Sequence, residues 1–249
     1  ALLLTGRAYE RLGDRAAAAP FLDRAAVARG NDGGPIDPAT PLTTLAAEAA
    51  GGDARAVARY VRGLMIAGNG GAALAEAQRL LRRNPGAPGA HMLVGDVLAA
   101  MQRWGEAARA YRDAASLQFS EGVALRLADA QTHAGDAAAG AATLSLFLAQ
   151  NPRSIPALNA ASDAMLAAGA WVRAAAVIRS VRLRIGNGDL LLLNNAAWAA
   201  NGAGDRARAL RFVQFAFGRQ PASPALADTL GTIIAEGGGD RAYGVALIE

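Results

Sequence analysis

The sequence predicts an all-α protein, a solenoid of stacked helix-turn-helix units. Three observations support this prediction: a glycine column with a nearly constant period, a second column of helix-ending residues in the same phase, and paired apolar runs at helical spacing. Such a period indicates that one supersecondary unit is repeated and that each copy packs on its neighbours. We therefore expect the 249 residues to form one elongated array.

The glycine column sets the period. Its positions lie 34, 33, 34, 35 and 34 residues apart, and they are Gly68, Gln102, Gly135, Gly169, Gly204 and Gly238. Glycine tolerates the left-handed conformation that ends many helices, and an aspartate directly after it can cap the next helix. We expect each position to lie in the tight turn between the two helices of a unit.

The second column marks the end of each unit. Its members are Pro85, Phe119, Pro152, Gly186 and Pro221, which lie 34, 33, 34 and 35 residues apart. Proline cannot continue a helix, and it biases the residue before it away from helical angles. Because the two columns keep one phase, they support the same repeat independently.

The helical runs place the elements in order. First helices are expected to begin near residues 54, 88, 121, 155, 190 and 224, each followed by a turn and a second helix. Residues 1–29 are expected to form a first helical hairpin, residues 30–53 an irregular joint with one short helix over Leu42–Ala50, and residues 54–249 about six repeats, the last one incomplete. Since the chain begins and ends within helical patterns, we interpret it as a piece of a longer protein or a processed form.

The composition excludes several classes of chemistry. All 25 basic residues are arginine, cysteine is absent, and the two histidines lie 42 residues apart. A thiol nucleophile, a Schiff-base lysine, a phosphate-binding-loop lysine and a thiolate metal site are therefore excluded, and the histidines do not have zinc-site spacing. We expect no enzymatic activity, no cofactor and no metal.

Charge and hydropathy limit the partners as well. The formal net charge is only +4, no dense basic run occurs, and we read the acidic residues as interleaved with arginines throughout. This pattern does not indicate a nucleic-acid surface. No apolar run approaches the ~18 residues that a transmembrane helix needs, so no transmembrane segment is expected.

The repeat motifs resemble those of the tetratricopeptide repeat family. Matching positions in two units are Val94-Gly95, Ala107, Tyr111 and Ala114, and then Leu193, Ala197, Ala209, Ala216 and Pro221. In other units the tyrosine position of the family pattern holds Gln131, Met165 and Ala200. The resemblance covers nearly the whole chain. It implies a right-handed α-solenoid of about seven stacked repeats, in an alanine- and arginine-rich bacterial member.

In that family the first helix of each repeat lines a concave groove, and the resemblance implies that surface here. The polar side chains expected on it are the candidates for contacting a partner: Arg55, Arg59, Arg62, Asp96, Arg126, Asp129, Asn159, Asp163, Asn194, Asn195, Trp198 and Asp228. Aspartates one repeat apart favour a basic partner segment, whereas the three arginines at the first end favour an acidic one. The alternative is an ordinary solvated helix face.

The sequence therefore predicts a non-enzymatic scaffold that binds a protein or peptide segment in a groove. Two more specific alternatives stay open: a scaffold for envelope or outer-membrane assembly or polysaccharide export, and a helical accessory region of a larger enzyme. Self-association through the terminal repeat is a further expectation. We expect a soluble bacterial protein, with a periplasmic or envelope-associated location slightly favoured over a cytoplasmic one.

Overall fold

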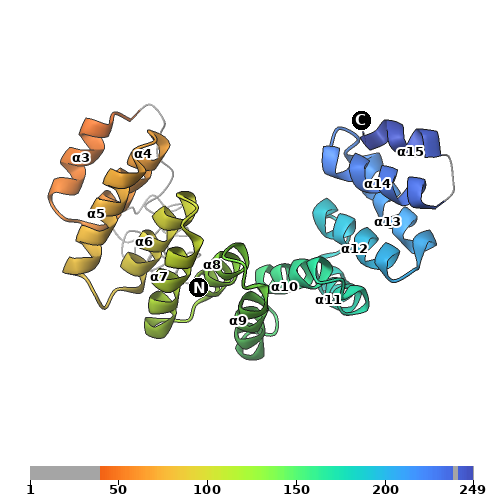
Figure 1. Ribbon diagram of the computed structural model, residues 1–249, viewed down its shortest axis with the longest axis horizontal. Helices are drawn as coiled ribbons and strands as arrows, with labels where there is room; N and C mark the ends of the chain where they lie inside the picture. The colour runs from red at the N-terminus through yellow and green to blue at the C-terminus, as the bar shows by residue number, and fades with distance from the viewer. Residues whose placement is uncertain (1–39, 238–240, 249) are drawn as a thin grey trace, which may run out of the picture. The chain divides into compact units, whose positions relative to one another are not determined.

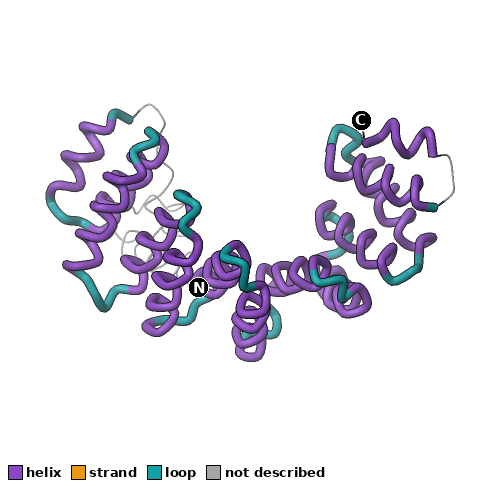
Figure 2. Tube along the Cα trace, viewed as in Figure 1, coloured by secondary structure: helices purple, strands orange, loops and turns teal. Residues whose placement is uncertain are grey.

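The computed structural model describes residues 40–237 and 241–248, and these residues form helices and turns without a strand (Figure 2). The chain divides into two compact units, Ala1–Thr143 (unit 1) and Leu144–Glu249 (unit 2), and the boundary falls inside helix α9 (Ala137–Gln150). The hairpin expected in residues 1–29 and the turn expected at Gly238 lie outside the described residues. The all-α prediction is confirmed for the part that is described.

Thirteen helices follow one another through the described residues (Figure 1). Besides α9 they are α3 (Leu42–Ala50), α4 (Ala54–Ile66), α5 (Gly70–Arg83), α6 (Pro88–Ala100), α7 (Trp104–Leu117), α8 (Glu121–His133), α10 (Ile155–Ala167), α11 (Trp171–Ile185), α12 (Leu190–Gly202), α13 (Arg206–Arg219), α14 (Pro224–Glu236) and α15 (Arg241–Ile248). From α3 to α8 and from α10 to α15, each helix packs against the next one along the chain. Even-numbered helices from α4 onward are the first helices of the repeats, and they begin at the predicted positions.

The turns between paired helices have the predicted left-handed conformation. The φ angle is 76° at Gly68, 91° at Gly135, 68° at Gly169 and 84° at Gly204. Gln102 occupies the same position with a φ of 59°, and it is the only non-glycine residue with a positive φ in the described part of the chain. A side chain in this conformation costs about 1–2 kcal/mol, so the repeat imposes its turn even where glycine is missing.

Aspartates after the turn glycines cap the second helices, as the sequence predicted. The Oδ1 atom of Asp136 accepts a hydrogen bond from the Ala139 N–H at 2.9 Å, at the start of α9. At the start of α13, Asp205 Oδ1 accepts from the Arg208 N–H at 3.1 Å. Each bond satisfies a backbone donor that has no partner within the helix.

The short helix α3 occupies Leu42–Ala50, and it packs directly on α4. Leu45 is only 1% exposed. A Cβ atom added at Gly63 of α4 would lie 2.7 Å from Leu45 Cδ1, so glycine permits the close approach of these two helices. The α3 helix therefore extends the helix stack at the beginning of the described region.

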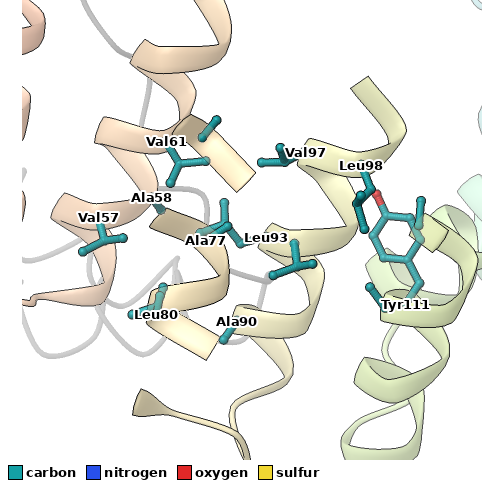
Figure 3. Packing of buried hydrophobic residues seen from close by; sticks show 14 of the residues in the cluster. Val57, Ala58, Val61, Ala77, Leu80, Ala90, Leu93, Val97, Leu98 and Tyr111 are labelled. Atoms are coloured by element: carbon teal, nitrogen blue, oxygen red, sulfur yellow. The ribbon is translucent and has the colours of Figure 1, made fainter. Parts of the chain in front are cut away.

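The core of unit 1 is a seam of small and branched apolar residues between successive helices. Ala77 and Leu80 of α5 lie against Ala90 and Leu93 of α6 (Figure 3). Alanines at these contacts let the helix axes approach closely, which explains how an alanine-rich chain with few aromatic residues forms a packed interior. Tyr111 of α7 belongs to the same seam and is 3% exposed.

Unit 2 repeats this packing with α10 to α15. Ile178 and Val181 of α11 are buried in one cluster, and Leu193 of α12 packs with Leu226 of α14 in another. In addition, α10 contacts α12, and α12 contacts α14. The first helices of unit 2 therefore form a continuous layer of neighbouring helices.

Candidate functional site

A hollow of about 400 Å³ opens on the first helices of unit 1. Three of the predicted groove residues line it: Arg62 on α4, Asp96 on α6 and Arg126 on α8. The rest of the lining is apolar or small, and consists of Val61, Met65, Gly89, Met92, Leu93, Val97 and Ala100. The repeat thus brings together charged residues from the first helices of three successive repeats and places them around an apolar floor.

The carboxylate of Asp96 is held by two neighbours. Its Oδ1 atom accepts hydrogen bonds from Tyr111 Oη at 2.7 Å and from Arg126 Nε at 2.9 Å. Burial of the phenol, together with the nearby carboxylate, raises the pKa of Tyr111 above its ordinary value, so the hydroxyl stays protonated as the donor. Asp96 is therefore already paired within the chain, and its side chain stays 42% exposed.

Arg126 is fixed in position by the same contacts. Besides its bond to Asp96, its Nη1 atom donates to the Gly122 carbonyl at 3.3 Å. The guanidinium side chain stays about one third exposed, at 35%. Arg62 on α4 and Arg126 on α8 share the lining of the hollow with the single carboxylate of Asp96.

Arg55 and Arg59 lie on α4 with Arg62 but do not line the hollow. Arg59 Nη1 forms an ion pair with Glu48 Oε2 at 3.0 Å, which links α4 to α3. This partner was missed by sequence reasoning because Glu48 belongs to the segment interpreted as an irregular joint. The Glu48 contact thus makes Arg59 part of the α3–α4 packing.

Asp129 on α8 also lies apart from the lining of the hollow. Its Oδ1 atom is 3.2 Å from Nδ1 of His133 on the same helix. The His133 ring in turn stacks on Trp104 of α7, with centroids 4.4 Å apart and an interplanar angle of 22°. These contacts form a small polar and aromatic cluster between the two helices.

In unit 2 the predicted residues lie along the first-helix layer. Asn195 Nδ2 of α12 donates to Asp163 Oδ1 of α10 at 2.6 Å. Partial burial raises the pKa of Asp163, although this hydrogen bond opposes the shift. Trp198 Nε1 of α12 donates to Thr229 Oγ1 of α14 at 3.1 Å. These two bonds join three consecutive first helices through predicted groove residues.

Two amide groups in this layer are incompletely paired. The Oδ1 atoms of Asn159 on α10 and Asn194 on α12 are buried and accept no hydrogen bond. A buried polar atom without a partner costs about 1–3 kcal/mol. Asp228, which lies one repeat beyond Asn194, is exposed on α14. The repeat therefore places polar groups with unused acceptor capacity along the layer.

The apolar floor of the unit 1 hollow was missed by sequence reasoning, which searched for polar residues alone. Met65 lies three residues after Arg62, and Met92 lies four residues before Asp96. Both separations put the methionine on the same helix face as the charged residue. This spacing is a sequence signal that could have found the floor.

Other kinds of site receive no support within residues 40–237 and 241–248. No group of three or more histidine, aspartate or glutamate side chains in that part of the chain could hold a metal ion. Among the same residues, no helix is both long and apolar enough to cross a bilayer.

Comparison with solved structures identifies the architecture. YrrB, described as a tetratricopeptide repeat protein with an unusual peptide-binding site, aligns with a TM-score of 0.56 and 18% identity, over 75% of this chain and 96% of YrrB. A tetratricopeptide repeat protein from Parabacteroides merdae aligns with a TM-score of 0.61 and 13% identity, over 99% of this chain and 96% of that one. A human IFIT1 dimer with m7Gppp-AAAA aligns with a TM-score of 0.55 and 14% identity, over 98% of this chain and 58% of that one.

No protein-family model matches the chain, and no curated protein matches it in sequence. At these identities the structural likeness establishes the fold and leaves the ligand open. The helix pairs, the turn conformations and these similarities agree, and this chain has the tetratricopeptide repeat fold.

Proposed function

We propose that this chain is a non-enzymatic interaction scaffold that binds a peptide segment of a partner protein on its first-helix faces. The observation that carries the proposal is the hollow of unit 1, which combines an apolar floor with Arg62, Asp96 and Arg126 at its sides. Binding sites for peptides commonly combine an apolar pocket with a few fixed polar groups. The volume of about 400 Å³ is enough for one large side chain and part of the main chain beside it.

The charge of the hollow indicates the kind of segment. The single carboxylate of the hollow already accepts hydrogen bonds from Arg126 and Tyr111, and the Arg126 side chain stays 35% exposed beside it. Arginine presents a planar fork of donors that matches a carboxylate, and Asp96 fixes this fork in place before binding. The proposed ligand is therefore a segment with a large apolar residue next to an aspartate or glutamate, and not the basic segment that a row of open aspartates would favour.

The first-helix layer of unit 2 is proposed as a second contact surface of the same kind. The unpaired carbonyl oxygens of Asn159 and Asn194 can accept hydrogen bonds from peptide N–H groups once their side chains rotate towards the ligand. Such bonds to the main chain hold an extended segment without specifying its side chains. Of the predicted residues here, Asn195 and Trp198 already donate to neighbouring first helices and act as supports for the surface.

The test is selection of binding peptides from a random library against the whole chain, followed by affinity measurements with labelled peptides. Arg126→Ala should weaken binding about tenfold, since it removes one charged hydrogen-bond donor. Arg82→Ala is the matched control, because Arg82 is an exposed arginine on the second helix α5. Selected peptides rich in lysine and arginine, or equal affinity for the Arg126→Ala variant and the wild type, would contradict the proposal.

Two narrower roles share this surface: assembly at a bacterial envelope, and service as the helical accessory region of a larger enzyme. They differ in the protein from which the bound segment comes. Matching the selected peptide sequences to the proteins of the source organism distinguishes them.

A further inference from the structure

The second helices of unit 2 carry an unusual concentration of positive charge. Each of α11 and α13 contains four arginines and no acidic residue. By contrast, the first helices α10, α12 and α14 contain no arginine and carry Asp163, Asp228 and Glu236. Our expectation that acidic residues are interleaved throughout the chain is wrong for this unit, because acidic and basic residues are segregated onto alternate helices.

A hollow of about 420 Å³ is lined by residues of α11 and α13 and by alanines of α12, and none of the predicted groove residues lines it. Three arginines line it, namely Arg179 and Arg182 on α11 and Arg208 on α13. Its apolar lining includes Ile178, Phe212, Val172 and the alanines of α12 beneath. Asp205 is the single acidic residue of the lining, and its Oδ2 atom is 3.2 Å from Arg208 Nε.

The guanidinium group of Arg182 is held rigidly over the aromatic floor. Its Cζ atom lies 4.5 Å from the centroid of the Phe212 ring. Its Nε and Nη2 atoms donate to Asn187 Oδ1 at 3.0 and 2.7 Å. This arrangement fixes the position of the charge, and Nη1 makes no hydrogen bond within residues 40–237 and 241–248. A ligand therefore meets a donor that does not have to be ordered on binding.

Arg179 completes the positive charge of the hollow. Its side chain is exposed, and within the described residues its guanidinium group forms no hydrogen bond and no ion pair. Val172, one side of the lining, is 74% exposed, and Leu183 on the same helix is 82% exposed. Large apolar side chains left in water beside a cluster of arginines mark a surface suited to a partner that is both acidic and apolar.

We infer that the hollow between α11 and α13 is a second binding site, and that its occupant is an acidic peptide segment of a partner protein. An apolar side chain of the segment packs on Val172 and Ala176, which are both exposed on α11. Carboxylates on either side of it pair with Arg179, Arg182 and Arg208. This site lies on second helices, so it adds a separate surface to the proposed first-helix function.

The geometry favours a peptide over the other anionic partners. Single-stranded nucleic acid is held by stacking of bases on open aromatic rings. Here Arg182 covers Phe212, and Arg219 lies 4.7 Å from the centroid of the Phe215 ring on the same helix. A lipid surface is flat and contacts protruding residues, whereas the three arginines of the lining face a recess between two helices.

The test uses a short fluorescein-labelled peptide in which glutamates flank one phenylalanine. Binding is measured by fluorescence polarisation to the whole chain in an Arg126→Ala background, which weakens the site of unit 1. Arg179→Glu should weaken binding at least about tenfold, because it replaces an attractive charge with a repulsive one. Val172→Glu should weaken it as well, and its exposure makes the variant compatible with folding. Far-UV circular dichroism verifies the fold of each variant.

Arg82→Glu is the matched control, because it makes the same change of net charge on α5 of unit 1. It should change the affinity less than about twofold, since Arg82 does not line the hollow. A peptide with glutamine in place of glutamate should bind poorly. Equal weakening by Arg179→Glu and Arg82→Glu, or no weakening by Arg179→Glu, would overturn the inference. Oligoadenylate or phosphatidylserine vesicles that bind in an Arg179-dependent way while the peptide does not would also overturn it.

Discussion

Replacement of Gly95 by alanine tests the helix packing that forms the repeat. Gly95 lies in the middle of α6, where its missing side chain admits the ring of Tyr111 from α7. A Cβ atom at this position would lie 2.4, 2.7 and 2.9 Å from three carbons of the ring, whereas ordinary contacts begin at 3.4 Å. The ring would therefore have to move by about 1 Å.

The surroundings of Tyr111 oppose that movement. The side chain is 3% exposed, and its hydroxyl is bound to Asp96 at 2.7 Å. Overpacking of this kind costs about 1–3 kcal/mol, and the fixed ring puts the cost near the upper end. Alanine in a helix interior is about 1 kcal/mol more favourable than glycine, which offsets part of it. We expect a net loss of about 2 kcal/mol in the free energy of unfolding.

The measurement is urea denaturation followed by far-UV circular dichroism. Gly105→Ala is the matched control, because Gly105 lies on α7 and an added Cβ there would meet nothing within 4 Å. That variant should be slightly more stable than wild type, by about 0.5 kcal/mol, near the helix start. If Gly95→Ala were as stable as Gly105→Ala, α6 and α7 would not pack at the distance described here.

Three further predictions concern the turns, the buried hydroxyl and a carboxylate. Gln102→Gly should stabilise the protein by about 0.5–1 kcal/mol, because it removes a side chain from a left-handed backbone conformation. Gly204→Ala should destabilise it by about 1 kcal/mol, because it adds one. Thermal or urea unfolding must therefore give changes of opposite sign in the free energy of unfolding for the two variants. Tyr111→Phe should cost about 1 kcal/mol through loss of its hydrogen bond to the carboxylate on α6, and an unchanged urea midpoint would exclude that contribution. Partial burial raises the pKa of Asp163 in the folded state. The ionised carboxylate therefore lowers the free energy of unfolding at pH values above that pKa, and this loss of stability disappears as the pH falls below the ordinary pKa of aspartate. Asp163→Asn should therefore raise the free energy of unfolding at neutral pH, with a difference that closes in acid; a difference that grew in acid would contradict the direction of the shift.

The fold was predictable because every unit needs the same kind of residue at its turn and at its end, and these residues form the two columns. A left-handed turn at Gly68, Gly135 or Gly204 is dictated by a few neighbouring residues, so its period is written directly in the sequence. Gln102 shows the strength of this pattern, since the position was placed in the column despite its side chain and has the same conformation. Helix starts followed from the same columns because each unit has nearly constant length.

The candidate site was only partly predictable, because contacts between repeats depend on side-chain rotamers. The resemblance implied that Asp96 and Arg126 share the groove surface, but it did not show that the carboxylate is bound by Arg126 and by a tyrosine of α7. The arginine-lined hollow of α11 and α13 was not predicted, because the resemblance implies a binding surface on the first helices. The absence of acidic residues from 171–185 and 206–219 was visible in the sequence, and would have indicated it.

The most direct test of the proposed function uses the four methionines as reporters. Met65 and Met92 line the hollow of unit 1, whereas Met165 lies on α10 of unit 2. The chain would carry Arg179→Glu to weaken the hollow of unit 2, would be labelled with ¹³C at the methionine methyl groups, and would be titrated with a selected acidic and apolar peptide. We predict that the Met65 and Met92 methyl resonances shift and that Arg126→Ala reduces the shifts at equal peptide concentration. Binding that left both resonances unmoved would contradict the assignment of the hollow as the peptide site.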